Sequence, residues 1–123
     1  MNKNATLVLG ATPNPDRYAH IATKRLLAAG EAVELVGIKK GEIDGIPIQN
    51  GRPKFDNIDT VTLYIGSRHL PEWADYIFEL KPRRIIFNPG TEHPQIIAQA
   101  REKGIQADIA CTLVMLASHQ YAL

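Results

Sequence analysis

The sequence has a single cysteine, no excess of charge of either sign and no long apolar run. Cys111 is alone among 123 residues, which excludes an intrachain disulfide and is typical of the reducing cytoplasm, where we expect the protein to be located. Lysine and arginine number 14 and aspartate and glutamate 13, so the net charge of +1 gives no reason to expect nucleic acid as a partner. No segment approaches the roughly 20 apolar residues of a membrane span or has the form of a secretory signal.

The residues of metal sites and of common catalytic groups are also sparse. The four histidines are scattered, without the spacing of a zinc site. No nucleophile elbow, phosphate loop of the G-x-x-x-x-G-K-[ST] type or Ser–His–Asp order is present. We therefore predict no metal and no catalytic residue, and we interpret Cys111 as a small apolar residue.

Apolar segments of strand length alternate with segments of helical periodicity along the whole chain. This alternation predicts one Rossmann-like three-layer α/β/α domain over residues 1–123, with a mainly parallel sheet of about five strands. The expected helices begin near Arg17, Pro71, Thr91 (as an N-cap) and Thr112, and Tyr18 and Trp73 are expected to pack in the core. The expected strands are residues 6–9, 31–36, 60–65, 84–88 and 105–109, with a possible short edge strand within the turn-rich residues 41–57.

The first strand runs into a glycine-containing turn and then into the first helix. Backbone N–H groups at the start of a helix lack acceptors, and the helix dipole favours an anion there. The sequence therefore predicts a phosphate site after the first strand, formed by Gly10, Ala11, Thr12, Pro13, Asn14 and Arg17.

The end of the second strand indicates which nucleotide is bound. A dinucleotide fingerprint has three glycines and an acidic residue at this strand end, whereas this chain has one of the glycines and Lys39 and Lys40 there. Lysines favour a ribose phosphate, so coenzyme A or NADP fits better than NAD. Ligands of parallel sheets bind beyond the carboxyl ends of the strands. The other candidate binding residues lie there: Gly37, Ile38, Tyr64, Ile65, Gly66, Asn88, Pro89 and Gly90, the last three of which fit a plain turn equally well.

An ordered set of short motifs resembles the small CoA-binding proteins, which are stand-alone relatives of the CoA-binding domain of succinyl-CoA synthetase alpha subunits. Residues 8–15, V-L-G-A-T-P-N-P, are similar to the family's G-A-S-x-x-P opening, and residues 36–39, V-G-I-K, to its V-N-P-K. Further matches are residues 45–48 to G-x-P-x-Y, 59–64 to D-x-V-x-x-F, 87–92 to W-x-Q-x-G-x-x-N, and 104–111 to the closing G-x-x-V-V…C.

The resemblance implies a domain that binds coenzyme A or an acyl-CoA, with Gly10 and Thr12 near the phosphates, Lys39 near the nucleotide and residues 64–66 near the adenine. We expect no catalysis by this chain and no membrane or nucleic-acid partner, and we leave open a homodimer or an unknown protein partner. Two alternatives stay open. One is a small NADP-dependent reductase. The other is an interaction protein that binds no nucleotide, which the departures from the family at residues 37–38 and 64–65 favour.

Overall fold

The computed structural model describes residues 3–122 and contains a seven-stranded sheet with the order β3-β4-β2-β1-β5-β6-β7. Every neighbouring pair is parallel except β3 and β4, which form an antiparallel hairpin. The predicted Rossmann-like class is confirmed, with two more strands than expected. The elements, in chain order, are β1 (Ala5–Leu9), α1 (Tyr18–Ala28), β2 (Ala32–Val36), β3 (Glu42–Ile43), β4 (Ile46–Gln49), β5 (Ile58–Leu63), η1 (Leu70–Glu72), α2 (Ala74–Glu79), β6 (Arg84–Phe87), α3 (Pro94–Glu102), β7 (Gln106–Ile109) and α4 (Thr112–Ala117).

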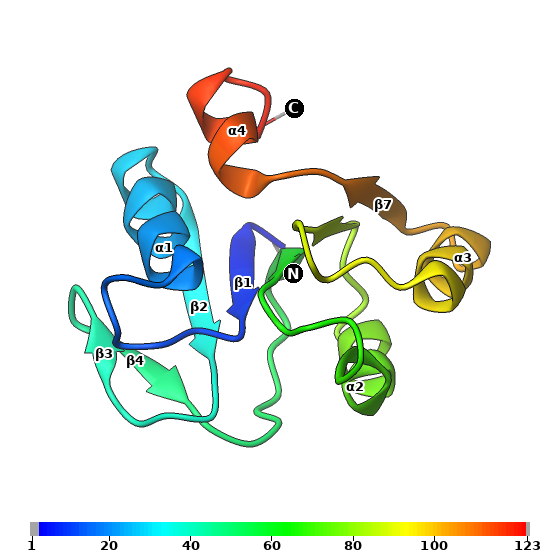
Figure 1. Cartoon of the computed structure of the whole chain (residues 1–123), viewed down its shortest axis with the longest axis horizontal. Coiled ribbons are helices and arrows are strands. Elements are labelled where there is room, and N and C mark those ends of the chain that lie inside the picture. Colours follow the sequence, from blue (N-terminus) through cyan, green and yellow to red (C-terminus); the bar gives the residue numbers. More distant parts are fainter. Residues whose placement is uncertain (1–2, 123) are drawn as a thin grey trace.

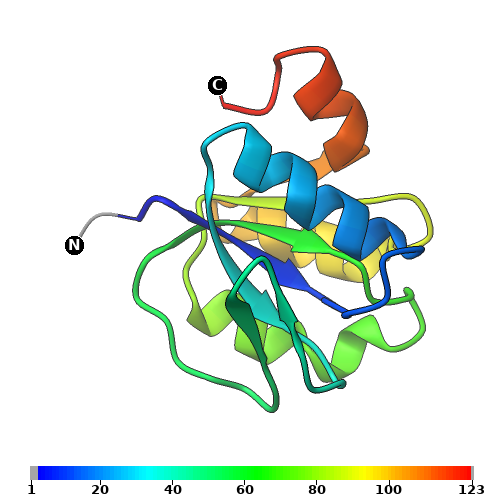
Figure 2. The ribbon, with the colours of Figure 1, turned by 90° about the vertical axis from the view of Figure 1, so that its left-hand side faces the viewer.

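Helices cover the sheet on both faces, as Figures 1 and 2 show. α1 and α4 lie on one face, where Leu26 packs against Val8 and Leu35. η1, α2 and α3 lie on the other, where Ile77 and Ile97 pack against β1, β5 and β6. All five residues of β1 are buried, because this strand lies at the centre of the sheet with a helical layer above and below it.

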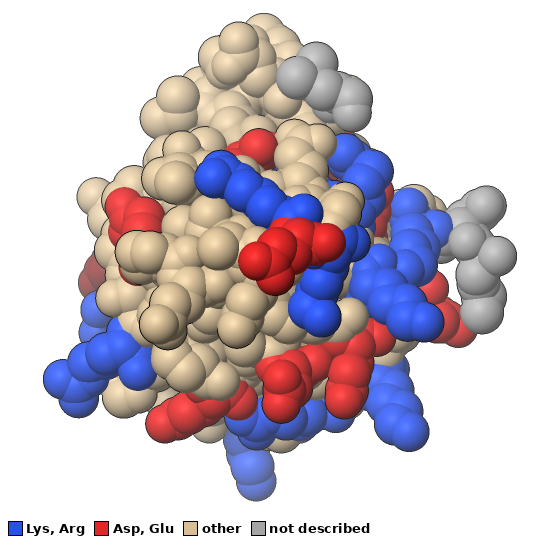
Figure 3. Space-filling model, turned by 90° about the vertical axis from the view of Figure 1, so that its right-hand side faces the viewer, with Lys and Arg blue, Asp and Glu red and all other residues tan. Residues whose placement is uncertain are grey.

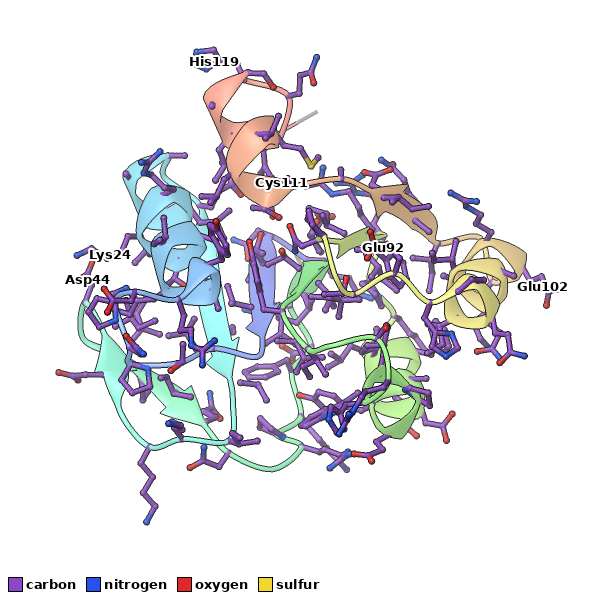
Figure 4. The ribbon with its side chains drawn as sticks, in the orientation of Figure 1. Lys24, Asp44, Glu92, Glu102, Cys111 and His119 are labelled. Carbon is purple, nitrogen blue, oxygen red and sulfur yellow. The ribbon has the colours of Figure 1, made fainter. Side chains whose placement is uncertain are left out.

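The strand order reverses at β1. The chain passes from β1 to β2 on one side, adds the β3–β4 hairpin, and then returns to pair β5 with the other side of β1. A switch of this kind separates the loops that follow neighbouring strands and leaves a crevice between them. The hairpin is the turn-rich segment predicted to hold an edge strand, and an ion pair of 2.8 Å between Lys24 and Asp44 ties its turn to α1 (Figure 4).

Two local predictions were wrong, the burial of Tyr18 and the N-cap of α3. Tyr18 is 72% exposed, because the buried side of α1 is formed by Ala19, Ala22, Thr23 and Leu26. The N-cap of α3 is His93, whose Nδ1 accepts from the Ile96 N–H at 3.3 Å. Thr91, the predicted cap, instead donates its hydroxyl to the Asn88 carbonyl oxygen at 2.8 Å.

The C-terminal segment packs near the starts of β1, β5 and β6, at the end of the sheet opposite to the crevice. Tyr121 is buried, and its hydroxyl forms a hydrogen bond with the Thr6 hydroxyl. The buried Arg84 guanidinium lies 4.4 Å from the centre of the Tyr121 ring and donates to the Tyr121 carbonyl oxygen at 2.8 Å and to Thr60 Oγ1 at 3.1 Å. These contacts satisfy a buried cation with neutral acceptors and an aromatic face.

Candidate functional site

A cleft of about 620 Å3 lies beyond the carboxyl ends of β2, β1 and β5, at the point where the strand order reverses. Its volume is within the range of small-molecule sites, about 300–1,000 Å3. Three segments line it: the β1–α1 loop with the start of α1, the loop after β2, and the segment from the end of β5 to Trp73.

Two glycines let the loops of this cleft approach each other closely. A Cβ atom on Gly37 would overlap the carbonyl oxygen of Ala11, and one on Gly10 would lie 2.6 Å from the carbonyl oxygen of Tyr64. Gly10 also has a φ of +105°, which residues with a Cβ rarely adopt. Both glycines therefore serve the packing of one loop on another.

The backbone N–H groups of the β1–α1 loop divide into two sets. Gly10 and Ala11 both donate to the carbonyl oxygen of Val36, at 2.9 Å each, so these groups are already satisfied. Those of Thr12, Tyr18 and Ala19 have no acceptor among residues 3–122, and all three residues line the cleft. α1 has no side-chain N-cap and no acidic residue in its first turn. The start of α1 is therefore the part of this loop that can accept an anion.

The two ends of the cleft differ in the charge of the side chains that line them. Arg17 and Lys39 line it where the β1 and β2 loops meet, and neither belongs to an ion pair found within the described residues. Glu72, together with His69 and Trp73, lines it beyond β5. A ligand with phosphates at one end and a neutral portion at the other complements this arrangement.

Tyr64 forms part of the cleft wall and keeps its phenol neutral. Its burial raises the pKa to about 12, although the hydroxyls of Thr112 and Thr62 act in the opposite direction. At physiological pH the phenol is therefore a hydrogen-bonding group and an apolar surface, and not an anion.

Of the sixteen predicted binding residues the structure brings eleven together around the cleft. These are Gly10, Ala11, Thr12, Asn14, Arg17, Gly37, Ile38, Lys39, Tyr64, Ile65 and Gly66. The other five, Pro13, Lys40, Asn88, Pro89 and Gly90, do not line it. Contact of any of the sixteen with a ligand stays a prediction.

Asn88 has a structural task that its position at a strand exit did not reveal. Its buried amide donates to Thr62 Oγ1 at 2.7 Å and to the Leu63 carbonyl oxygen at 2.9 Å, and its Oδ1 accepts from the Thr112 N–H at 2.8 Å. The side chain thus joins β6, β5 and α4, which agrees with the interpretation of this segment as a turn.

Sequence reasoning missed several cleft residues, namely Leu9, Tyr18, Ala19, Val36, His69, Glu72 and Trp73. Tyr18 and Trp73 were expected in the core because their spacing fits an apolar helix side. Trp73 is half-buried and does contact the core, but it is also part of the cleft wall. Glu72 lies in the 3₁₀ turn Leu70–Glu72, at the start of the helix that was predicted near Pro71, but the sequence did not indicate that this residue lines the cleft.

A second hollow, of about 500 Å3, lies among the described residues and is lined by Glu34, Lys54, Phe55, Asp56 and Asn57, none of which belongs to a helix. On the face shown in Figure 3, which carries α2 and α3, acidic and basic side chains lie side by side. Within residues 3–122 there is no group of three metal-ligating side chains and no helix long and apolar enough to cross a membrane. Cys111, at the start of α4 (Figure 4), is half-buried and lies outside the cleft lining.

The fold and the cleft define a nucleotide-binding type of α/β domain, in which a crevice at the strand-order switch meets a helix N-terminus. Residues 4–117 match the model of a family described as "CoA binding domain", and the chain belongs to this family. The suspected resemblance is therefore confirmed. No curated protein matches the sequence.

Solved structures have the same fold. A crystal structure titled only as an uncharacterized protein is 45% identical, with a TM-score of 0.93 over 98% of this chain and 100% of that chain. A hypothetical protein from Pyrococcus horikoshii OT3 is 24% identical, with a TM-score of 0.82 over 94% of this chain and 83% of its own. A protein from Thermus thermophilus is 20% identical, with a TM-score of 0.82 over 96% and 91%. The last two are similar in fold.

Proposed function

We propose that this protein binds coenzyme A or an acyl-CoA in the cleft and has no catalytic machinery of its own. The observation that carries the proposal is the coincidence, in one cleft, of two cations and of backbone N–H groups for which residues 3–122 supply no ion-pair partner and no acceptor. Membership of the CoA-binding family supports the choice of ligand.

The residues present fit the phosphates of this ligand. The N–H groups of Thr12, Tyr18 and Ala19 would receive phosphate oxygens, and the dipole of the 11-residue α1 would add to the attraction. Arg17 and Lys39 would neutralise the charge, as Arg pairs with phosphate through two hydrogen bonds and Lys acts as a point charge. The apolar surfaces of Ile38 and Ile65 would contact the adenine.

The two alternatives make different predictions. A nucleotide-free interaction protein predicts an occluded crevice, whereas the cleft is open and about 620 Å3 in volume. An NADP-dependent reductase predicts binding of NADPH and hydride transfer. The single glycine of the β1–α1 turn departs from the dinucleotide fingerprint and favours coenzyme A.

Thermal unfolding with CoA, acetyl-CoA, NADPH and NADH in parallel tests the proposal. A ligand at about 100 times its Kd that binds only the folded state adds roughly 2.7 kcal/mol, which raises the Tm by several degrees. We expect a shift with the CoA compounds alone. A shift with NADPH alone would replace the proposal with the reductase, and no shift with any compound would favour the interaction protein. A thiol reagent then tests catalysis: acetyl-CoA incubated with the protein should release no more free thiol than acetyl-CoA alone.

Two adjacent lysines provide a matched test of the site. Lys39 and Lys40 are both exposed, but only Lys39 lines the cleft. We expect Lys39→Glu to weaken CoA binding by at least about tenfold, since it replaces attraction with repulsion close to the phosphates. Lys40→Glu changes the net charge equally and should weaken binding about threefold or less, as expected for a charge screened by solvent. Calorimetric titration measures both, and equal effects would place the phosphates elsewhere.

A further inference from the structure

The connection between β4 and β5 contains a short segment, residues 50–53, that holds two walls of the cleft. At its start the Asn50 side-chain amide donates to the carbonyl oxygens of Gly37 and Lys39, at 2.6 and 3.1 Å. These two carbonyl groups flank Ile38, so a single side chain fixes the loop that carries Ile38 and Lys39 into the cleft.

Two residues further on, the same segment is attached to the other wall. Arg52 Nη2 donates to the carbonyl oxygen of Glu72 at 2.8 Å, and its guanidinium carbon lies 4.1 Å from the centre of the Trp73 ring. The next residue, Pro53, accepts a hydrogen bond from the Tyr76 hydroxyl at 2.6 Å. Glu72 and Trp73 both line the cleft, at the end opposite to Lys39.

Neither Asn50 nor Arg52 lines the cleft, and both are exposed. Exposed hydrogen bonds and cation–π contacts contribute little to folding, and β2 is already joined to β4 by the strand ladder and by the Gly37 N–H bond to Gln49. Their contacts instead connect the two walls of the cleft through residues 50–53.

We propose that residues 50–53 form a strap that sets the separation of the two cleft walls, with Asn50 and Arg52 as positioning residues for the ligand. The identity of the ligand as coenzyme A rests on the proposed function, whereas the mechanical link between the walls does not. Because one strap reaches both walls, loss of either attachment releases the same constraint, so the two side chains act together.

The link is tested first in the protein without ligand. Backbone amide shifts of 15N-labelled Arg52→Ala should change at Gly37 and Lys39, on the wall that Arg52 does not touch, and those of Asn50→Ala should change at Trp73. Trp73 is the only tryptophan, so its fluorescence reports the same wall in an unlabelled sample. Gln99→Ala, an exposed amide on α3 with no side-chain hydrogen bond among the described residues, is the control for Asn50→Ala. Shifts confined to the wall that each side chain touches would overturn the strap.

Affinity for CoA tests the positioning role. We expect Asn50→Ala and Arg52→Ala each to weaken CoA binding about threefold to tenfold, with the Tm lowered by no more than about 3 °C. The double variant should bind CoA no more weakly than about twice the Kd of the poorer single variant, since the constraint is lost once. Arg52→Lys, which keeps the charge over Trp73, should recover part of the affinity, and Arg25→Ala, an exposed arginine on α1, should leave it unchanged.

The outcomes separate the two proposals. If the wild-type protein does not bind CoA, the proposed function fails and the amide shifts still decide the strap. If it binds CoA but affinity in both alanine variants equals that of the wild type, the positioning role is wrong. Multiplicative losses in the double variant would likewise show that the two side chains act independently and would overturn a single strap.

Discussion

Replacing Gly37 with alanine tests whether the close approach of two loops creates the cleft. The added methyl carbon would overlap the carbonyl oxygen of Ala11 and lie 3.0 Å from its carbonyl carbon. Both atoms belong to backbone, so no side-chain rotation relieves the clash, and the two loops must separate. Val36, which receives the N–H groups of Gly10 and Ala11, directly precedes Gly37, so this separation strains two hydrogen bonds of 2.9 Å as well.

Overpacking of this kind typically costs about 1–3 kcal/mol. The strained backbone bonds place Gly37→Ala at the upper end, about 2–3 kcal/mol, which lowers the Tm by roughly 6–15 °C in a chain of this size. CoA affinity should fall more than about tenfold, because the loops that separate carry both the helix start and Lys39.

Gly66→Ala is the matched control. Gly66 lines the same cleft, but a Cβ atom there would meet nothing within 4 Å, and its φ is outside the left-handed region. We expect its free energy of unfolding to stay within about 0.5 kcal/mol of the wild type or to rise slightly. Urea unfolding and calorimetric titration with CoA measure both variants. A Gly37→Ala protein as stable as Gly66→Ala, with unchanged CoA affinity, would refute the argument from loop contact.

Three further predictions concern stability. Asn88→Ala should lower the free energy of unfolding by about 2–3 kcal/mol, as it leaves buried partners on β5 and α4 unsatisfied; a loss below about 0.5 kcal/mol in urea unfolding would contradict this. Burial acts to raise the pKa of Asp59, but the hydrogen bonds from Arg83 and Thr60 and the positive charges of Arg83 and Arg84 together outweigh it, so the pKa lies below its usual value. The Asp59→Asn variant should therefore be less stable than the wild type by up to about 1 kcal/mol at pH 7. This difference should disappear as the pH falls through the folded-state pKa of Asp59. A difference in the free energy of unfolding that persists at pH 2 in urea titrations would contradict the assignment. Tyr121→Phe should cost about 1 kcal/mol in thermal unfolding, because the hydroxyl of Thr6 loses its buried partner, whereas an unchanged Tm would show that water replaces it.

The sequence predicted the parts of the fold that follow from a regular pattern. The central strands were found because strands covered by helices on both faces are almost entirely apolar, as β1 and β6 are. The β3–β4 hairpin was harder, since its strands have two and four residues and its turn residues dominate the composition. Tyr18 was wrongly placed in the core, because Ala19 and Thr23, which are buried on α1 instead, are small and carry a weaker apolar signal than Tyr18.

The position of the candidate site in the fold could be predicted, because backbone topology determines it. Which individual residues line the site could not always be predicted, because that depends on the direction of each side chain. Eleven predicted residues line the cleft because the carboxyl ends of parallel strands lie at the same edge of the sheet. Lys39 and Lys40 are adjacent in sequence, but only Lys39 lines the cleft, and the sequence does not distinguish the two. Asn88 was predicted to bind because it follows a parallel strand. Only the structure shows that its amide is hydrogen-bonded to β5 and α4.

The cleft is built from an early part of the chain. Its lining begins at Leu9 and ends at Trp73, and no described residue after Trp73 takes part. β6, α3, β7 and α4 extend the sheet and cover its faces but do not reach the cleft. On the proposed function, ligand choice is therefore encoded in the first 73 residues. Beyond Trp73, Tyr76 holds Pro53 of the strap and the Thr112 hydroxyl acts on Tyr64, but no later described residue lines the cleft, so differences in ligand preference between relatives should be sought mainly in the first part.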